Sequence, residues 1–277
     1  EWGGGEKWHL EMANHLHSKG NSVLIITQPG SAISKYAIDL GISVHYVKLN
    51  NLSVLNPFTI ISLVRVLKKQ GVESIVLNLS RDLKCGGIAA KIAGVNKIIF
   101  RRGSDRPVRN YFINRYLYQK LVSGILTNSN ATKKAILSNG TSLVSPNKIK
   151  VIPNGIDTLS FINRPFNYVR EKRDGLLTIV ALGRLVPQKN FKFLIPVAQE
   201  LKKRDISFRI LIGGKGTQEE FLRSLVSEHN LEKEIEFLGF FENPKDLLMS
   251  ADIFLLPSLW EGFGYVVAEA SLSCLPV

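Results

Sequence analysis

The stretch LTIVALGRLVPQKNFKFLIPVAQELKKRDISFRILIGG, residues 177–214, contains two short apolar runs on either side of an amphipathic segment. The runs 177–183 and 208–214 are rich in β-branched residues and predict strands, whereas 193–204 has the apolar spacing of a helix. Both runs are apolar on successive residues, which is typical of parallel strands covered by helices on both faces. A strand, a helix and a second strand in this order form the repeating unit of α/β domains.

The same alternation continues on both sides of this stretch. We predict further strands at 22–27, 74–79, 97–100, 124–128, 148–154, 235–240 and 252–257. Helical patterns lie between them, for example at 7–19, 57–70 and 217–230. A polar stretch with little periodicity, near 158–175, interrupts the alternation. We therefore predict two doubly wound, Rossmann-like α/β domains with parallel sheets, residues 1–160 and 176–277, joined by a linker at 161–175.

The composition is that of a globular protein with a large core. The chain has 277 residues, of which 45% are apolar, and this length suggests about two domains. Its two cysteines, Cys85 and Cys274, provide no disulfide framework, which favours a reducing compartment. No apolar run approaches the roughly 20 residues that a membrane-spanning helix needs.

The two ends of the sequence suggest a fragment of a longer protein. It begins at Glu1 inside a glycine-rich loop and ends at Val277 in an apolar run. In a Rossmann-like order the first strand is central. We therefore expect an interior strand of the first domain, and the last strand-helix units of the second domain, to lie outside this sequence.

Charge is distributed unevenly along the chain. Residues 1–170 contain 23 Lys and Arg against 8 Asp and Glu, whereas residues 171–277 contain 13 against 15. A basic surface confined to one half suggests an anionic partner, such as an anionic membrane, a phosphorylated lipid or glycan, or nucleic acid. The sequence contains no zinc finger, RRM signature or basic helix with heptads, so a nucleic-acid partner is not expected.

The stretch EGFGYVVAE, residues 261–269, places a carboxylate on each side of a glycine turn. A glycine turn that leads into a helix exposes backbone N–H groups beside the positive end of the helix dipole, and this arrangement binds anions. Carboxylates such as Glu261 and Glu269 repel phosphate but accept hydrogen bonds from hydroxyls. Phosphate donors flanked by hydroxyl acceptors suit a sugar nucleotide. Two solvated acids on a buried strand-turn-helix would give the same pattern.

This stretch resembles the EGFG…E signature of the retaining GT-B glycosyltransferases of family 4. Four other segments resemble further motifs of that family, in the family's order: GGGEKWHLEMANHLHSKGNSV (3–23), LTNSNATKKAIL (126–137), VIPNGID (151–157) and GRLVPQKN (183–190). Together the five motifs cover nearly the whole chain. The resemblance implies the GT-B fold, in which an acceptor-side N-terminal domain and a C-terminal domain that binds the nucleotide sugar face a cleft.

The resemblance also implies roles for side chains that match the motifs. Arg184 and Lys189 would clamp the donor diphosphate and neutralise the charge that develops on the leaving group. Glu261 would bind hydroxyls of the transferred sugar, and Glu269 would bind those of the ribose. Arg184, Lys189 and Glu261 are therefore the expected catalytic residues.

Backbone groups complete the implied donor site. The N–H groups of Phe263 and Gly264 would meet the phosphate or the sugar. Gly3 and Gly4 resemble the loop through which the N-terminal domain approaches the donor, and Gly214 resembles the corresponding loop of the second domain. Glycine suits these places because backbone that approaches a ligand closely leaves no space for a side chain. Ordinary tight turns would explain the same glycines.

The sequence departs from the family pattern at two places. Many relatives carry a histidine after the strand that corresponds to 97–100, where this chain has Arg101 and Arg102. These two arginines are expected on the acceptor or anion side of the site. Cys274 stands where the family usually has glycine, and it would be strained if a positive φ is required there.

We therefore expect a retaining hexosyltransferase that moves a sugar from a nucleoside diphosphate sugar to a cell-envelope glycan or lipid acceptor, as in lipopolysaccharide or polysaccharide biosynthesis. A GT-B sugar-nucleotide epimerase and a non-catalytic sugar-nucleotide-binding relative remain alternatives. No Asp-x-Asp or other metal cluster is evident, so neither a metal nor another cofactor is expected. The family and the basic first half favour a cytoplasmic protein in peripheral contact with the inner face of the cell membrane.

Overall fold

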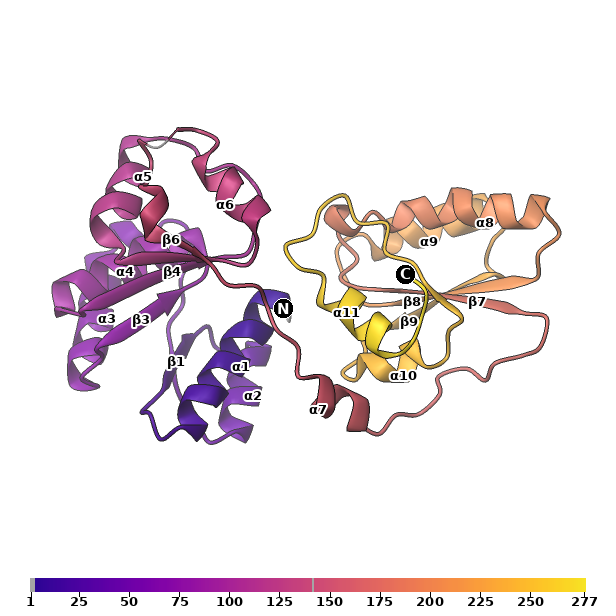
Figure 1. Ribbon diagram of the computed structural model, residues 1–277, viewed down its shortest axis with the longest axis horizontal. Coiled ribbons are helices and arrows are strands. Elements are labelled where there is room, and N and C mark those ends of the chain that lie inside the picture. The colour runs from indigo at the N-terminus through magenta and orange to yellow at the C-terminus, as the bar shows by residue number, and fades with distance from the viewer. Residues whose placement is uncertain (1–2, 141) are drawn as a thin grey trace. The chain divides into compact units, whose positions relative to one another are not determined.

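The computed structural model describes residues 3–140 and 142–277 (Figure 1). The chain divides into two compact units, Glu1–Asn154 and Gly155–Val277. Each unit alternates strands with helices, and the strand pairs among the described residues are parallel. The predicted α/β class with parallel sheets is confirmed.

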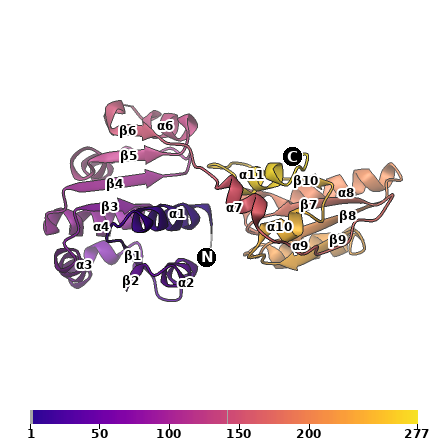
Figure 2. The ribbon, with the colours of Figure 1, turned by 60° about the horizontal axis from the view of Figure 1, so that its bottom comes forward.

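The first unit contains two groups of parallel strands. The larger group is a sheet in which the following strands lie side by side (Figure 2): β3 (Ser74–Leu77), β4 (Lys97–Arg102), β5 (Gly124–Thr127) and β6 (Ile149–Val151). The smaller group pairs β1 (Leu24–Thr27) with β2 (Ser43–Tyr46). Among the described residues no ladder joins β1 to β3, and the interior strand expected outside this sequence stays a prediction.

Side chains cap some of the helices of the first unit. The helices of this unit are α1 (Gly4–Ser18), α2 (Ala32–Asp39), α3 (Pro57–Lys69), α4 (Ser80–Ala93), α5 (Phe112–Tyr116) and α6 (Asn130–Leu137), with short helical turns at Ser53–Leu55, Leu117–Leu121 and Pro146–Lys148. The Asn56 side chain caps α3 by accepting the N–H of Phe58 at 3.0 Å. Ser129 caps α6 by accepting the N–H of Thr132 at 3.1 Å.

The main core of the first unit joins its four-stranded sheet to α3, α4 and the turn Leu117–Leu121. Phe100 of β4 and Tyr118 pack edge to face in this core, with 5.6 Å between their ring centroids. Gly87 brings α4 close to the turn, because an added Cβ would lie only 2.7 Å from Leu121. This packing fixes the loops that follow β3 and β4.

The second unit is one sheet covered on both faces. Its strand order is β10 (Ile253–Phe254), β7 (Leu177–Leu182), β8 (Phe208–Gly213) and β9 (Ile235–Gly239). Its helices are α7 (Thr158–Asn163), α8 (Leu194–Lys203), α9 (Glu219–Glu228), α10 (Pro244–Leu248) and α11 (Tyr265–Leu272), with short turns at Pro187–Lys189 and Phe191–Phe193. Ile179 of β7 packs with α8 and α9, whereas Val180 packs with α7, α10 and α11. The doubly apolar strands therefore serve two cores, one on each face.

The segment 161–175, predicted as a linker, differs from that expectation because its first residues pack into the second unit. Phe161 of α7 is 4% exposed and belongs to the core that contains α10 and α11. The ammonium of the buried Lys245 donates to the carbonyl oxygens of Ile162 at 2.6 Å and Arg164 at 2.8 Å. The unit boundary at Asn154–Gly155 accordingly lies before the predicted one.

The described helices are too short or too polar for a membrane span. None of them is both long enough and apolar enough to cross a membrane. The longest among those given above, α1, carries charged side chains such as Glu6, Lys7 and Glu11 along its length.

Candidate active site

The loop after β10 and the start of α11 form the centre of the predicted donor site. Gly264 lies directly before α11 with a φ of 75°, in the left-handed region. A Cβ at this position would also lie 3.3 Å from Cγ2 of Val267, so both the conformation and the available space favour glycine. The first turn of a helix has N–H groups without partners inside the helix, and these can bind an anion.

Lys189 and Glu261 are in direct contact beside this turn. The Nζ of Lys189 lies 2.5 Å from Oε1 of Glu261, and the Ser258 hydroxyl donates to the same oxygen at 2.6 Å. The Lys189 and Glu261 side chains are 12% and 26% exposed, so the ion pair is largely withdrawn from water. An ammonium carries three N–H donors, so Lys189 can hold Glu261 and an anion at the same time.

Hydrogen bonds between two loops hold this pair in place. Gln188 donates from its side chain to the carbonyl of Trp260 at 2.8 Å, and its own carbonyl accepts the N–H of Leu259 at 2.9 Å. Asn190 donates from its side chain to the carbonyl of Pro257 at 3.1 Å. The basic loop after β7 and the loop before α11 therefore form one connected surface.

Glycines at the ends of β7 and β8 allow the backbones of the two strands to touch. A Cβ on Gly214 would lie 1.9 Å from the carbonyl oxygen of Gly183, and one on Gly216 would lie 2.2 Å from that of Leu185. The side chain of Lys189 packs against the backbone of Gly183, because a Cβ added to Gly183 would lie only 3.2 Å from Cε of Lys189. Gly214 is thus required by close backbone packing beside the lysine.

Arg184 and Glu269 occupy different surroundings in the second unit. Arg184 is exposed and follows β7 by two residues, in the same loop as Lys189. Glu269 is 4% exposed on α11, although it is a carboxylate. Phe263 precedes the start of α11 and is 37% exposed. The structure thus places the predicted site residues of the second unit on α11 and on the loops that follow β7, β8 and β10.

The other predicted residues lie in the first unit, where Arg101 is buried at 5% exposure. Its guanidinium donates to Oδ1 of Asn78 at 3.3 Å and to Oδ1 of Asn154 at 3.1 Å, and it lies 4.8 Å from the Trp8 ring centroid. Arg101 thereby connects the ends of β3, β4 and β6 to α1. The neighbouring Arg102 donates instead to the backbone carbonyl of Arg106 at 2.5 Å.

Most of the glycine-rich segment 3–5 belongs to helix α1 and not to a loop. Gly3 is the extended residue before α1, and Gly4 is the first helical residue. A Cβ on Gly5 would lie 2.7 Å from the Asn78 side chain, so this third glycine makes the close approach. Burial lowers the pKa of His9 to about 4, and its ring Nδ1 lies 3.1 Å from the carbonyl oxygen of Gly5.

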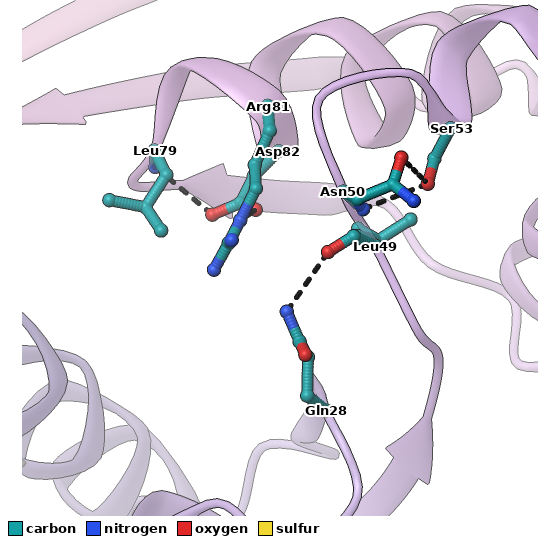
Figure 3. Close-up of polar contacts among 7 residues, drawn as sticks. All are labelled: Gln28, Leu49, Asn50, Ser53, Leu79, Arg81 and Asp82. Atoms are coloured by element: carbon teal, nitrogen blue, oxygen red, sulfur yellow. Dashed lines mark hydrogen bonds and ion pairs between the residues drawn. The ribbon is translucent and has the colours of Figure 1, made fainter. Parts of the chain in front are cut away.

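Polar contacts also fix the loops at the carboxyl ends of β1, β2 and β3 (Figure 3). Gln28, after β1, donates to the carbonyl of Leu49, after β2, at 3.0 Å. Asp82 accepts the N–H of Leu79 at 3.0 Å and thereby caps α4. Burial raises the pKa of Asp82, and the positive charge of Arg81 opposes this shift.

Sequence reasoning did not single out several of these partners. No sequence pattern assigns a chemical role to Gln188, Asn190 or Trp8. Their contacts join positions that are far apart in the chain. Within the described ranges, no three His, Cys, Asp or Glu side chains gather where they could hold a metal ion.

The chain matches two family models that together span both units. Residues 2–159 match the model described as Glycosyltransferase Family 4, and residues 167–277 match Glycosyl transferases group 1. The structure is also similar to that of Anabaena HepE in complex with UDP-glucose, with a TM-score of 0.80 at 20% identity, covering 100% of this chain and 77% of that one.

Two curated relatives are similar over most of this chain. The UDP-Gal:alpha-D-GlcNAc-diphosphoundecaprenol alpha-1,3-galactosyltransferase of Escherichia coli is 28% identical over 79% of this chain and 60% of its own length. The capsular polysaccharide biosynthesis glycosyltransferase CapH of Staphylococcus aureus is 30% identical over 83% of this chain and 64% of its own length. The chain thus spans about three fifths of these relatives. It belongs to glycosyltransferase family 4 and has the GT-B fold.

Proposed function

We propose that the whole protein is a retaining hexosyltransferase that uses a nucleoside diphosphate sugar and acts on a cell-envelope glycan or a lipid-linked acceptor. The observation that carries this proposal is the contact between Lys189 and Glu261 at the glycine turn before α11. A cation and a hydroxyl-binding carboxylate at one helix start fit the phosphate and the sugar of such a donor.

Each end of the donor has a matching group in the second unit. Lys189 and Arg184 bind the diphosphate, and the N–H groups of Phe263 and Gly264 bind the phosphate or the sugar. Glu261 accepts hydrogen bonds from hydroxyls of the transferred sugar, and Glu269 accepts those of the ribose. Gly214 lets the backbone come close to the nucleotide.

The reaction requires that charge on the departing diphosphate be stabilised. The acceptor hydroxyl oxygen attacks the anomeric carbon, the bond from this carbon to the phosphate oxygen breaks, and the electron pair stays on that oxygen. The leaving phosphate takes the acceptor proton on the same face of the sugar, which gives retention. Cations placed before the reaction lower this barrier, commonly by the largest single contribution. Arg184 and Lys189 would supply this charge without a metal ion.

Names of relatives and the charge of the first half support the acceptor class. The Escherichia coli relative is named for a diphosphoundecaprenol-linked acceptor, and residues 1–170 carry a large excess of Lys and Arg. We infer that the protein works at the inner face of the cell membrane in peripheral contact with anionic lipid, to which each basic residue near the surface adds about 1 kcal/mol.

A thermal-shift screen of the full-length protein against UDP, GDP and ADP sugars tests the donor site. A ligand that binds only the folded state raises the melting temperature. We expect a shift with one nucleotide class, lost in Glu269→Ala and unchanged by excess EDTA. The matched control is Glu228→Ala, at the exposed end of α9. No shift with any donor would contradict the proposal, and loss of the shift with EDTA would contradict metal independence.

A further inference from the structure

The hydroxyl of Ser258 makes a contact that the roles proposed above do not use. Ser258 lies in the loop between β10 and α11, and its Oγ donates to Oε1 of Glu261 at 2.6 Å. This distance is typical of a hydroxyl bound to a carboxylate, a bond stronger than one between neutral groups. The same oxygen accepts from Nζ of Lys189 at 2.5 Å. Two donors from different loops thus meet on one oxygen of Glu261.

The other carboxylate oxygen of Glu261 is available to a ligand. In the part of the chain that the structure describes, no hydrogen bond or ion pair involves Oε2 of Glu261. The Glu261 side chain is 26% exposed, so a bound molecule can reach it. Each carboxylate oxygen has about two lone pairs. The two donors on Oε1 therefore fill that oxygen and leave Oε2 to accept from a ligand.

Hydrogen bonds on both sides of Ser258 fix its backbone without the hydroxyl. The carbonyl of Pro257 accepts from the Asn190 side chain at 3.1 Å, and the N–H of Leu259 donates to the carbonyl of Gln188 at 2.9 Å. Neither bond involves the Ser258 side chain. Removal of the hydroxyl should therefore leave the turn in place and release only the carboxylate that the hydroxyl holds.

The ammonium of Lys189 cannot select one oxygen of Glu261 by itself. An ammonium is a point charge with three equivalent donors at the end of a flexible stem, so it can pair with either carboxylate oxygen in many orientations. A serine hydroxyl has one proton to donate and a short reach from its backbone. Because the Ser258 backbone is fixed, its hydroxyl determines how the Glu261 carboxylate is turned.

We propose that Ser258 is a positioning residue of the donor site, whose hydroxyl holds Oε1 of Glu261 beside Lys189 so that Oε2 accepts from hydroxyls of the transferred sugar. This inference rests on the proposed function, in which Glu261 binds that sugar. It adds the residue that orients the carboxylate and the oxygen that contacts the donor. An ionised carboxylate only accepts hydrogen bonds, so the ligand group at Oε2 must be a donor such as a hydroxyl.

Calorimetric titration of the full-length protein separates the sugar from the nucleotide. The probes are UDP, GDP and ADP, each compared with its glucose ester. The ratio of the Kd of an ester to that of its free diphosphate isolates the sugar, because the nucleotide contacts are common to both. Ser258→Ala should weaken binding of the ester by about five- to tenfold and change binding of the free diphosphate less than about twofold.

Ser271→Ala is the matched control. Ser271 is exposed on α11, and its hydroxyl donates to the carbonyl of Val267 at 3.0 Å. This variant should leave both Kd values within about twofold of the wild-type values. A loss in Ser258→Ala that is as large for the free diphosphate as for its ester would overturn the proposal, because the hydroxyl would then support the loop as a whole. Melting curves verify that each variant is folded.

A double-mutant cycle with Glu261→Gln tests whether the hydroxyl acts through the carboxylate. Residues that act through one contact have effects that do not add. Ser258→Ala introduced into Glu261→Gln should therefore weaken binding of the ester by less than about a further twofold. Losses that multiply would show that Ser258 acts independently of Glu261, and would overturn the proposal.

The same titrations distinguish failure of this inference from failure of the proposed function. If the wild-type protein binds none of the six probes, the proposed function is contradicted, and this inference with it. If the wild-type protein binds a diphosphate and its ester but Ser258→Ala leaves their ratio unchanged, this inference alone is contradicted.

Discussion

Lys189 is the single side chain whose removal should reduce turnover most. Its ammonium is held by Glu261 at 2.5 Å, and in the reaction proposed above it would stabilise the negative charge that develops on the leaving diphosphate. We expect Lys189→Ala to lower kcat by about 100- to 1,000-fold, the usual effect of losing one group that stabilises charge in the transition state. Initial rates with a saturating donor measure this. Lys192→Ala, an exposed cation three residues further on, should leave kcat within about twofold.

His9 should make the stability of the first unit depend on pH. Burial lowers its pKa from 6.5 to about 4, so the folded protein keeps the ring neutral. Above pH 6.5 the ring is neutral in both states and has no effect. As the pH falls from 6.5 to about 4, the unfolded chain binds a proton that the folded chain does not, and the free energy of unfolding falls by about 3 kcal/mol.

Chemical denaturation at a series of pH values measures this dependence on His9. His9→Gln should flatten the slope between pH 6.5 and 4, whereas His17→Gln, exposed on the same helix, should keep it. An unchanged slope in the His9 variant would show that other groups cause the loss of stability. Because the comparison concerns the slope, it holds even if the His9 variant is less stable throughout.

The residues of the site were predictable one by one, but their contacts were not. The motif resemblance named both Lys189 and Glu261 as donor-site residues. Their ion pair joins loops 72 positions apart, and no local pattern encodes that distance. Likewise, the family resemblance singled out Arg101 because it stands near the place where many relatives have a histidine. The contact of Arg101 with the Trp8 ring and its hydrogen bond to Asn154 depend on how three strands and a helix assemble.

At the scale of elements, the end of α11 contains strain that a substitution should relieve. Cys274 follows the helix with a φ of 58°, and the N–H of Leu275 donates to the carbonyl of Ala270 at 3.1 Å. This is a helix end at which glycine is preferred. Cys274→Gly should raise the free energy of unfolding by about 1 kcal/mol, measured as a higher melting temperature. Cys274→Ala keeps the Cβ and should give no such gain, so equal stabilisation by both would exclude backbone strain as the cause.

A strand or helix can be predicted from the sequence when many of its residues are buried, because buried residues are mostly apolar and form a recognisable pattern. The strands β7 and β8 were recognised because nearly every residue of each is buried. The strand β2, with the sequence SVHY, has exposed residues at both ends and lacks such a run. Helix α7 was read as part of a linker because Phe161 is its one buried residue. A single buried side chain gives no periodicity, although it is enough to anchor a helix.

At the scale of the whole molecule, Lys245 attaches the segment after α7 to the rest of the second unit. This lysine is 7% exposed, donates to two carbonyls of residues 162–164, and lies 5.1 Å from the ring centroid of Phe166. A buried cation of this kind stabilises the segment through charge-assisted hydrogen bonds, each contributing roughly 1.5–3 kcal/mol. The segment after α7 therefore belongs to the stable part of the second unit.

Replacement of this lysine should release the segment without unfolding the sheet. In Lys245→Met the two carbonyls lose their donor, so local opening becomes more frequent. Cleavage by trypsin after Arg170 should then be at least about tenfold faster than in the wild-type protein, since it follows the population of the open form. Mass spectrometry of the fragments over time measures this. Lys233→Met, at an exposed position of the same unit, should be cleaved in this segment at the wild-type rate. Equal rates in all three proteins would mean that Phe161 and the core around α7 hold the segment on their own, and that the buried ammonium contributes little to its attachment.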